Sequence, residues 1–338
     1  MGEPSRFIRQ LEYEYAKANE KVKLEHCQYN SPAIKEKHVP IVITKNDGML
    51  GKIKSLSPTS IGTYVRCQLQ FYWKYIEKIE DKSPEEEMQL NVIGSIIHGT
   101  LDNFYQKFVK NEKVSLQLFD AMYKKYFDEC YQNALKSNGF ANGLPDTGFN
   151  CLNKTVIESM LKNFFKNERR FIEEGNVFSI IDTEIELSKT IESNGYSVQL
   201  HGFADRIDKV GDEIRIIDYK TGKVHSNDVK IGDKVEGLTG MTEKSIQLMM
   251  YKYLYLAEHS NSEQLIKPGI IGFQKLSHGL YNLEINASHG LSTSFEETCT
   301  RYFNDFLAEM FNKDIPFTQT EELKNCSFCD FKSICKRG

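Results

Sequence analysis

The sequence of 338 residues lacks the features that mark several simpler classes of protein. No apolar run approaches the ~18 residues that a membrane-spanning helix requires, and the amino terminus, MGEPSRFIRQLEYEY, has no signal-peptide pattern. A Walker A pattern, G-x-x-x-x-G-K-[ST], is also missing, so this chain cannot by itself drive ATP-dependent unwinding. These absences predict a cytoplasmic protein with no membrane partner and no motor of its own.

An excess of positive charge is absent as well, because the formal net charge is −4. A global basic field for nucleic acid is therefore excluded, although a local basic groove beside an acidic metal site is not. The 40% apolar and 27% charged residues are typical of a soluble globular protein with a real core. The length allows one elaborated domain or two.

The chain changes texture along its length. Residues 1–55 resemble an extension, with a short amphipathic stretch and a connection rich in Gly and Lys. Residues 56–338 form the main domain: a helical part at 56–173, a strand-rich part at 177–290, and a long amphipathic helix with a cysteine tail at 294–338. We therefore predict an α/β fold with a mixed central sheet flanked by helices, a helical insertion and a terminal cysteine segment.

The strand-rich part holds the pattern with the most chemistry. In IRIIDYKTGK, Asp218 and Lys220 are two residues apart, so a strand points both side chains to one face. GFADRID supplies Asp205 one strand earlier, and the short turn between the strands makes them antiparallel neighbours. Two such carboxylates can share a hard divalent cation, with Lys220 beside it. The alternative is a solvated Asp/Lys pair at a strand end.

Other polar residues flank these strands in a suggestive order. His98 lies on a predicted helix, Glu184 and Glu186 share a face of the first strand, and Gln247 and Tyr251 are one helical turn apart after the strands. Each has an ordinary structural interpretation alone. Their order, His, Glu, Asp, Asp-x-Lys, Gln-x3-Tyr, favours a single site.

The last residues, CSFCDFKSICKRG, concentrate three thiols. A tetrahedral thiolate site needs four ligands, and only Cys326, Cys329 and Cys335 are supplied here. In a cytoplasmic protein such cysteines are metal ligands more often than disulfides. The residues alone leave zinc and iron-sulfur open, with zinc slightly favoured. Packed or surface thiols are expected for Cys27, Cys130, Cys151 and Cys299.

Residues from about 55 onward resemble the RecB-like branch of the PD-(D/E)xK nucleases. The resemblance implies a restriction-endonuclease-like core, Mg²⁺ or Mn²⁺ held by the His and the two Asp side chains and the carbonyl of Tyr219, a catalytic lysine, and a Gln/Tyr helix that shapes the DNA site. It also makes Glu184 a candidate for the additional acid, without separating it from Glu186. The motifs that carry the resemblance are G-SIIH at His98, GFADRID at Asp205, IIDYKTGK at Asp218 and Lys220, and Q-LMM-Y at Gln247 and Tyr251.

The same resemblance extends to the nuclease domain of AddB-type helicase-nucleases and to similar CRISPR-adaptation nucleases. It implies a [4Fe-4S] cluster, favoured over zinc, in which Cys67 of SPTSIGTYVRCQLQFYWKYI completes the C-x2-C-x5-C tail. SRFIRQL is similar to a helicase junction, which makes helicase domains and an AddA-like subunit the expected partners. The implied function is metal-dependent, exonucleolytic DNA degradation in repair or recombination. Alternatives are a stand-alone CRISPR-adaptation or phage-type nuclease, and a non-catalytic module that binds DNA ends.

Contact with DNA should come from local basic stretches interleaved with aromatics. KNFFKNERRF contributes Lys162, Lys166, Arg169 and Arg170, and the tail contributes Lys332, Lys336 and Arg337. The alternative for either stretch is a solvated charged face.

Overall fold

The computed structural model describes residues 6–19, 21, 39–79, 90–109, 113–141, 143–144, 148–232, 237–259, 263–285 and 294–337. The chain divides into two compact units, Met1–Val39 and Pro40–Gly338. In the first unit, α1 (Arg6–Gln10), a π-helical segment (Leu11–Tyr15) and α2 (Ala16–Ala18) form consecutive helical turns, as the amphipathic pattern predicts. Residues 40–55, which we expected in the extension, group with the second unit because two short strands join them to it.

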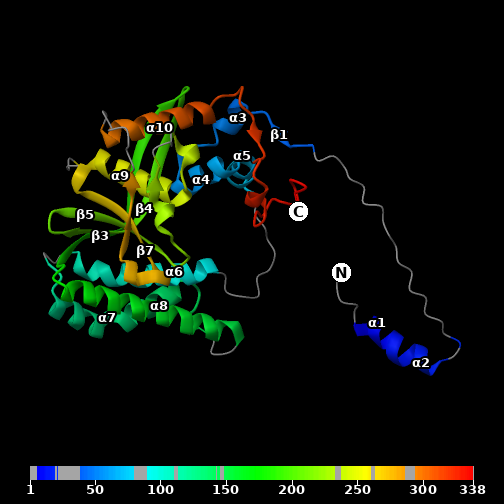
Figure 1. The fold of residues 1–338 in the computed structure, drawn as a ribbon, viewed down its shortest axis with the longest axis horizontal. Helices are drawn as coiled ribbons and strands as arrows, with labels where there is room; N and C mark the ends of the chain where they lie inside the picture. The colour runs from blue at the N-terminus through cyan, green and yellow to red at the C-terminus, as the bar shows by residue number, and fades with distance from the viewer. Residues whose placement is uncertain are drawn as a thin grey trace. The chain divides into compact units, whose positions relative to one another are not determined.

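The second unit is built on a mixed, twisted sheet (Figure 1). β3 and β4 form a long antiparallel hairpin, and β4 also pairs with β2 in parallel and with β5 in antiparallel. β5 then pairs in parallel with β7, and β7 in antiparallel with β8. This confirms the predicted α/β class with a mixed central sheet. The strands are β2 (Ser55–Leu56), β3 (Phe178–Ser193), β4 (Tyr196–Val210), β5 (Glu213–Lys220), β7 (Ile266–Gly272) and β8 (Leu280–Asn282).

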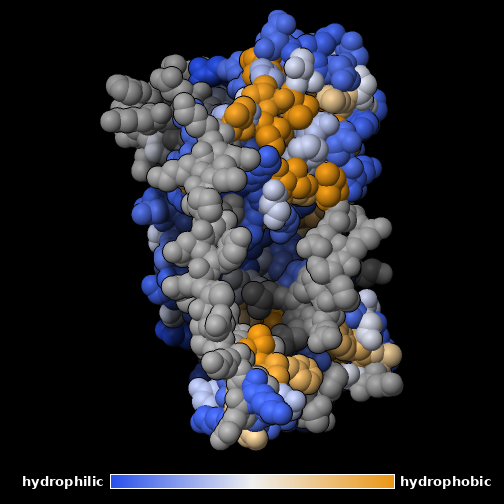
Figure 2. All heavy atoms as spheres, turned by 90° about the vertical axis from the view of Figure 1, so that its right-hand side faces the viewer, coloured by the Kyte–Doolittle hydropathy of each residue, from blue (hydrophilic) through white to orange (hydrophobic). Residues whose placement is uncertain are grey.

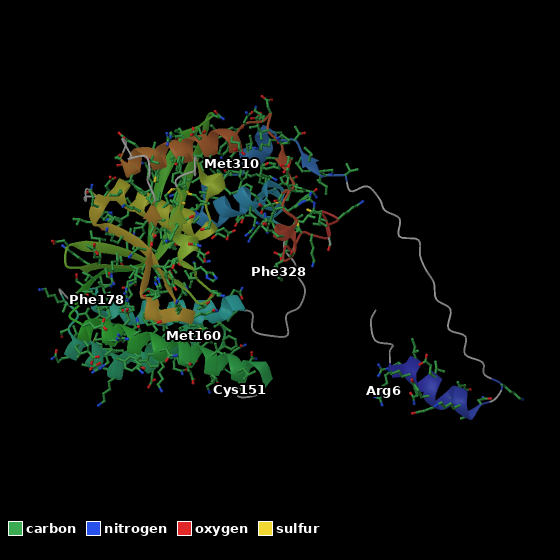
Figure 3. All side chains as sticks on the ribbon, in the orientation of Figure 1. Arg6, Cys151, Met160, Phe178, Met310 and Phe328 are labelled. Atoms are coloured by element: carbon green, nitrogen blue, oxygen red, sulfur yellow. The ribbon has the colours of Figure 1, made fainter. Side chains whose placement is uncertain are left out.

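Helices cover both faces of the sheet. In Figure 1, α9 and α10 lie above the strands, with α4 and α5 on the same side, and α6, α7 and α8 lie below them. Figure 3 places Met310 at the end of α10 in the upper layer and Met160 on α8 in the lower one. The helices are α3 (Asp47–Leu50), α4 (Pro58–Arg66), α5 (Gln68–Phe71), α6 (Leu90–Tyr105), α7 (Leu116–Ser137), α8 (Gly148–Glu173), α9 (Glu243–Glu258) and α10 (Phe295–Met310).

Each layer has its own apolar core, and the central strand contributes to both. Ile216 packs in the cluster with α4, α9 and α10, whereas the next residue, Ile217, packs in the cluster with α6, α7 and α8. Successive side chains of a strand point to opposite faces. A strand that is covered on both sides is therefore apolar at nearly every position, and the few polar residues at its end stand out in the sequence.

Helix starts are specified locally by capping side chains. Ser57 caps α4, with Pro58 at the first helical position and Ser60 completing a capping box. Ser294 and Glu297 do the same for α10. These caps explain why the helix starts could be read from the sequence.

A buried ionic network ties β4 to the helical insertion. Arg206 is fully buried, with its guanidinium 2.8 Å from Glu168 of α8 and 2.9 Å from Asp208. Arg215 pairs with Asp208 at 2.6 Å, and Tyr105 of α6 donates a hydrogen bond to Glu168. Buried charges are costly unless their partners are fixed. Because Arg206 follows Asp205 directly, this network fixes the position of the strand that carries the first candidate metal ligand.

The carboxyl-terminal segment closes against the beginning of the second unit. β1 (Val42–Ile43) pairs with β10 (Phe317–Thr318), and the Lys45 ammonium donates to Tyr64 and to the carbonyls of Glu309 and Met310. Burial lowers the pKa of Lys45 to about 8. Figure 2 shows the face on this side of the molecule, where apolar patches lie among polar residues. Within the described ranges, no helix combines the length and apolarity needed to cross a bilayer.

Candidate active site

The predicted site residues converge where β4 and β5 meet α6 and α9. β4 carries Asp205, and β5 carries Asp218 and Lys220 at its carboxyl end. His98 comes from α6 in one helical layer, and α9, in the other, supplies Gln247 and Tyr251. Residues that span more than 150 positions of sequence therefore meet around the end of one strand.

Asp205 is the hub of one half of the site. It is 8% exposed, its Oδ1 lies 3.0 Å from His98 Nδ1, and its Oδ2 accepts the backbone N–H of Tyr219 at 2.5 Å. Burial opposes protonation of His98, but the hydrogen bond and charge of Asp205 outweigh it and raise the pKa of the imidazole. Because Asp205 also binds the backbone beside Asp218, it fixes the relative position of the two strands.

Asp218 anchors the other half. Its carboxylate is 3% exposed and accepts from Lys220 Nζ at 3.0 Å and from Gln247 Nε2 at 2.7 Å. Gln247 also donates to the Tyr251 hydroxyl, which in turn donates to the Phe203 carbonyl at 2.6 Å. Burial raises the pKa of Asp218, and Lys220 opposes that shift. The Gln-x3-Tyr pair therefore orients Asp218 and fastens it to β4.

A glycine makes room for this chain of hydrogen bonds. A side-chain carbon at Gly202 would lie 2.7 Å from the Tyr251 ring. Real Cβ atoms do not approach so closely, so the tyrosine can cross the strand only above a glycine.

Glu184 joins His98 and Asp205 in a potential metal-binding group. One ligand atom from each of the three lies within 4.8 Å of the other two. Glu186, by contrast, lies 4.0 Å from His201 Nδ1. Glu184 stands opposite Asp205 in the hairpin register with φ of +48°, a left-handed conformation that is unfavourable for a non-glycine residue. The structure thus separates two acids that the alternating pattern could not, and it stores backbone strain at the site.

The donor set fits a hard divalent cation. Carboxylate oxygens with one imidazole suit Mg²⁺ or Mn²⁺, whereas a thiolate-rich set would suit softer metals. Partial desolvation and the negative charges of Asp205 and Asp102 raise the pKa of Glu184 to about 7. A cation would relieve that repulsion. The roles of His98, Asp205, Asp218 and the Tyr219 carbonyl as ligands remain predictions.

Replacing Glu184 by glutamine should stabilise the metal-free protein in a pH-dependent way. The raised pKa means that the folded chain holds a proton that the unfolded chain loses above about pH 4.5, so the unfolding free energy falls between pH 4.5 and 7. At pH 8 the variant should be more stable by about 1 kcal/mol, a value reduced for solvent exposure. At pH 4 the two proteins should unfold alike in urea. A pH-independent difference would contradict this account.

Asp102 belongs to the same neighbourhood but was not predicted. It follows His98 by one helical turn on α6, and it accepts a hydrogen bond from the Thr183 hydroxyl on β3. It thereby holds α6 against the strand beside Glu184. The i, i+4 spacing of the two residues on one helical face was the available signal.

A second cluster gathers the four predicted cysteines around one pocket. Cys67 lies with Cys326, Cys329 and Cys335 in its lining. The Cys67 sulfur accepts the backbone N–H of Gln70 at 3.4 Å. Burial raises the pKa of Cys335, and hydrogen bonds from Gln319 and Trp73 oppose that rise. The tertiary structure therefore brings the upstream cysteine to the tail, as the resemblance implies.

Sulfur spacing bears on the choice of metal. Among the described residues, no three cysteines place their sulfurs all within 4.8 Å of one another. Four thiolates around one zinc ion, at ~2.3 Å each, would lie only ~3.8 Å apart. A cluster of several irons separates its ligands more widely. The wider spacing favours the iron-sulfur cluster, which remains a proposal.

The remaining cysteines and the basic stretches behave differently from one another. Cys130 and Cys299 are buried, and burial raises their thiol pKa values; Cys27 lies outside the described residues. Arg169 pairs with Asp120 and Glu173, and Arg170 pairs with Glu174 at 2.8 Å. Much of the charge of KNFFKNERRF is therefore neutralised by its own helix layer, which weakens the case for a DNA track there.

A mixed sheet between two helical layers, with a D-x-K strand end facing acids and a histidine, defines a metal-dependent hydrolase type of site. The profile of the PD-(D/E)XK nuclease superfamily matches residues 55–336 of this chain. The chain belongs to that superfamily. The confirmed resemblance covers the whole sheet, both helical layers and the cysteine tail.

Two individual proteins are similar to this chain. The B-type subunit of an ATP-dependent helicase/deoxyribonuclease from Carboxydothermus hydrogenoformans is 26% identical over 238 residues, which are 65% of this chain and 20% of that protein. The chain thus corresponds to about a fifth of the length of that relative. A solved structure titled "Crystal structure of SSO0001" aligns with 86% of this chain and 87% of its own, at 16% identity and a TM-score of 0.31. That score is too low to support the fold assignment.

Proposed function

We propose that the chain is a metal-dependent deoxyribonuclease that hydrolyses DNA phosphodiester bonds, and that it degrades strands from their ends. The observation that supports this most directly is the convergence of His98, Asp205 and Asp218 with Lys220 at one strand end. Superfamily membership and the deoxyribonuclease named in the relative agree with it.

The residues divide the work between holding a cation and handling the phosphate. His98, Glu184, Asp205 and Asp218 would hold Mg²⁺ or Mn²⁺. When bound, the cation supplies Lewis-acid polarisation of the scissile phosphate and makes a neighbouring water more acidic. Lys220 Nζ, held 2.8 Å from Asp218, can donate a hydrogen bond to a phosphate oxygen or orient the attacking water. Gln247 and Tyr251 position Asp218 without touching the reacting atoms.

The relative suggests the biological setting. Because it belongs to a helicase/deoxyribonuclease and this chain covers a fifth of it, we propose that the chain works with helicase domains and an AddA-like subunit in DNA repair or recombination. The four-cysteine cluster would staple the carboxyl-terminal segment to α4 and α5 and so complete the domain.

The test is degradation of end-labelled linear single-stranded DNA, with a circular control, by protein purified without oxygen. Wild type should degrade the linear strand when Mg²⁺ is added, and Lys220→Ala should not. Survival of the circle identifies an exonuclease. If wild type binds DNA but cleaves neither substrate, the DNA-end-binding alternative replaces this proposal.

A further inference from the structure

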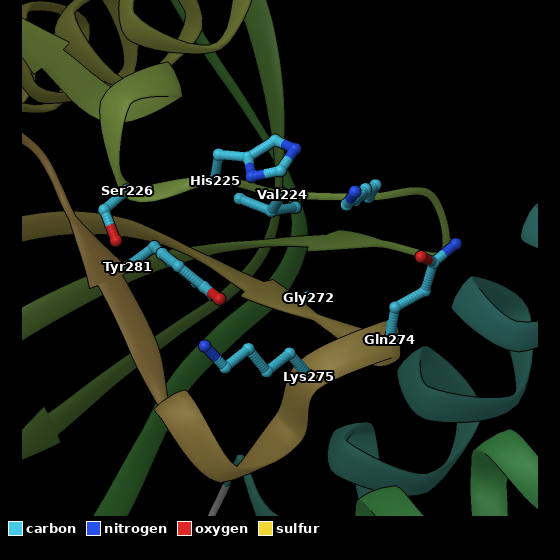
Figure 4. Close-up of a pocket in the computed structure, with 8 residues that line it drawn as sticks. Val224, His225, Ser226, Gly272, Gln274, Lys275 and Tyr281 are labelled. Carbon is cyan, nitrogen blue, oxygen red and sulfur yellow. The ribbon is translucent and has the colours of Figure 1, made fainter.

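A basic pocket lies immediately beyond the D-x-K strand end (Figure 4). β5 and β7 end side by side, with Lys220 opposite Gly272, and Gly272 forms part of the pocket wall. The cavity has a volume of about 380 Å³. Its polar lining consists of Lys223, His225, Ser226, Gln274, Lys275 and Tyr281.

The lining carries positive charge that is not neutralised. Lys223 and Lys275 are exposed, and no carboxylate belongs to the lining. Within the part of the chain that the structure describes, neither lysine forms an ion pair. Neighbouring lysines do: Lys220 pairs with Asp218, and Lys244 pairs with Asp228. Two free ammonium groups beside hydroxyl, amide and imidazole groups make a site for an anion with several acceptor oxygens.

The walls of the pocket are held in place by packing. The Tyr281 ring is 3% exposed and stacks on His278, with ring centroids 3.7 Å apart. Gln274 donates to the Thr221 carbonyl at 3.5 Å, which links η7 (Phe273–His278) to the loop after β5. A side-chain carbon at Gly272 would lie 3.2 Å from Val224. In Figure 4, Lys275, Tyr281 and His225 extend from separate segments toward a common space.

We propose that this pocket binds a terminal phosphomonoester of the DNA strand that the active site cleaves, an inference that rests on the proposed nuclease function. A phosphomonoester carries nearly two negative charges, which match two lysines better than the single charge of a backbone diester does. Lys223 follows Lys220 by three residues, so an anchored end would place a bond close to that end at the catalytic lysine. The enzyme would then release short products from phosphorylated ends.

Binding in EDTA tests the proposal without cleavage. One fluorescent oligonucleotide is prepared with a 5′ phosphate, with a 3′ phosphate and with neither, and its affinity is measured by fluorescence anisotropy. Wild type should prefer one phosphorylated form by about tenfold. Lys223→Gln/Lys275→Gln should reduce that preference to less than about twofold while still binding the unphosphorylated strand. The matched control is Lys124→Gln/Lys136→Gln, two exposed lysines on α7 with the same change of charge.

Each outcome decides the question. Equal affinity of wild type for all three oligonucleotides would overturn the proposal, and so would an equal loss for all three in the double variant, which would indicate an ordinary backbone contact. Competition by a 5′ mononucleotide at the same concentration as the phosphorylated strand would show that the pocket takes free nucleotide instead. Lys220-dependent cleavage without end preference would leave the nuclease standing and remove the pocket, whereas end preference without cleavage would do the reverse.

Discussion

Replacing Asp218 by asparagine is expected to lower the rate of Mg²⁺-dependent DNA cleavage by at least about a thousandfold. Asp218 both offers a ligand oxygen and holds Lys220, so the substitution removes a metal contact and releases the catalytic lysine. The metal-free protein should be at least as stable as wild type at pH 8. Burial raises the pKa of Asp218, which means that its ionised form is disfavoured in the fold and a neutral amide is not.

The combination of lost activity and kept stability is what distinguishes a functional carboxylate from a structural one. Cleavage rates, DNA affinity in EDTA and urea unfolding should be measured on the same preparations. Asp212→Asn, an exposed aspartate in the turn before β5, is the matched control and should change none of them. If Asp218→Asn cleaved DNA at more than about a tenth of the wild-type rate, the assignment of this strand end as the catalytic centre would be wrong.

Replacing Cys67 by serine is expected to remove the metal cluster and lower the midpoint of thermal unfolding by about 5–10 °C. Cys67 is far in sequence from the three tail cysteines, so a shared cluster would close most of the chain into one loop. The tail is otherwise fastened by few contacts, among them the β1–β10 pair and the bond from Gln319 to the Cys335 carbonyl at 3.1 Å. Iron, sulfide and zinc content should be measured together with the melting curve.

The only tryptophan of the sequence gives this experiment a second readout. Trp73 donates to Cys335, so its fluorescence should be quenched by an iron-sulfur cluster and recover in Cys67→Ser. Zinc would not quench it. The control is Cys151→Ser, a half-buried thiol on α8 outside the cluster pocket. Full iron content in Cys67→Ser would refute the four-cysteine assignment, and one equivalent of zinc in wild type would refute iron-sulfur.

The two clusters have different energetic roles. Carboxylates at the nuclease site repel one another without a cation, as the raised pKa of Glu184 shows, so this site costs stability until it is loaded. The thiolate site, by contrast, links distant segments and should contribute stability when loaded. Chelation of Mg²⁺ should therefore leave the fold intact, while loss of the cluster should loosen the carboxyl-terminal segment.

Some features followed from sequence because they depend on local spacing. Asp218 and Lys220 share a strand face by the period of two, Gln247 and Tyr251 share a helical face by the i, i+4 rule, and caps such as Ser57 mark helix starts. The choice between Glu184 and Glu186 did not follow. The left-handed backbone at Glu184 interrupts the alternation that any sequence argument must assume.

The sequence by itself determined the α/β class, the strand that carries the chemistry and the identities of the candidate ligands, because these depend on residue type and short-range periodicity. Only the tertiary structure decided that α4 and α6, neighbours along the chain, cover opposite faces of the sheet, and that Asp102 and a basic pocket border the site. Such juxtapositions arise from packing between segments that are distant in sequence. No local pattern encodes them, since a helix can bury the same apolar face on either side of a sheet.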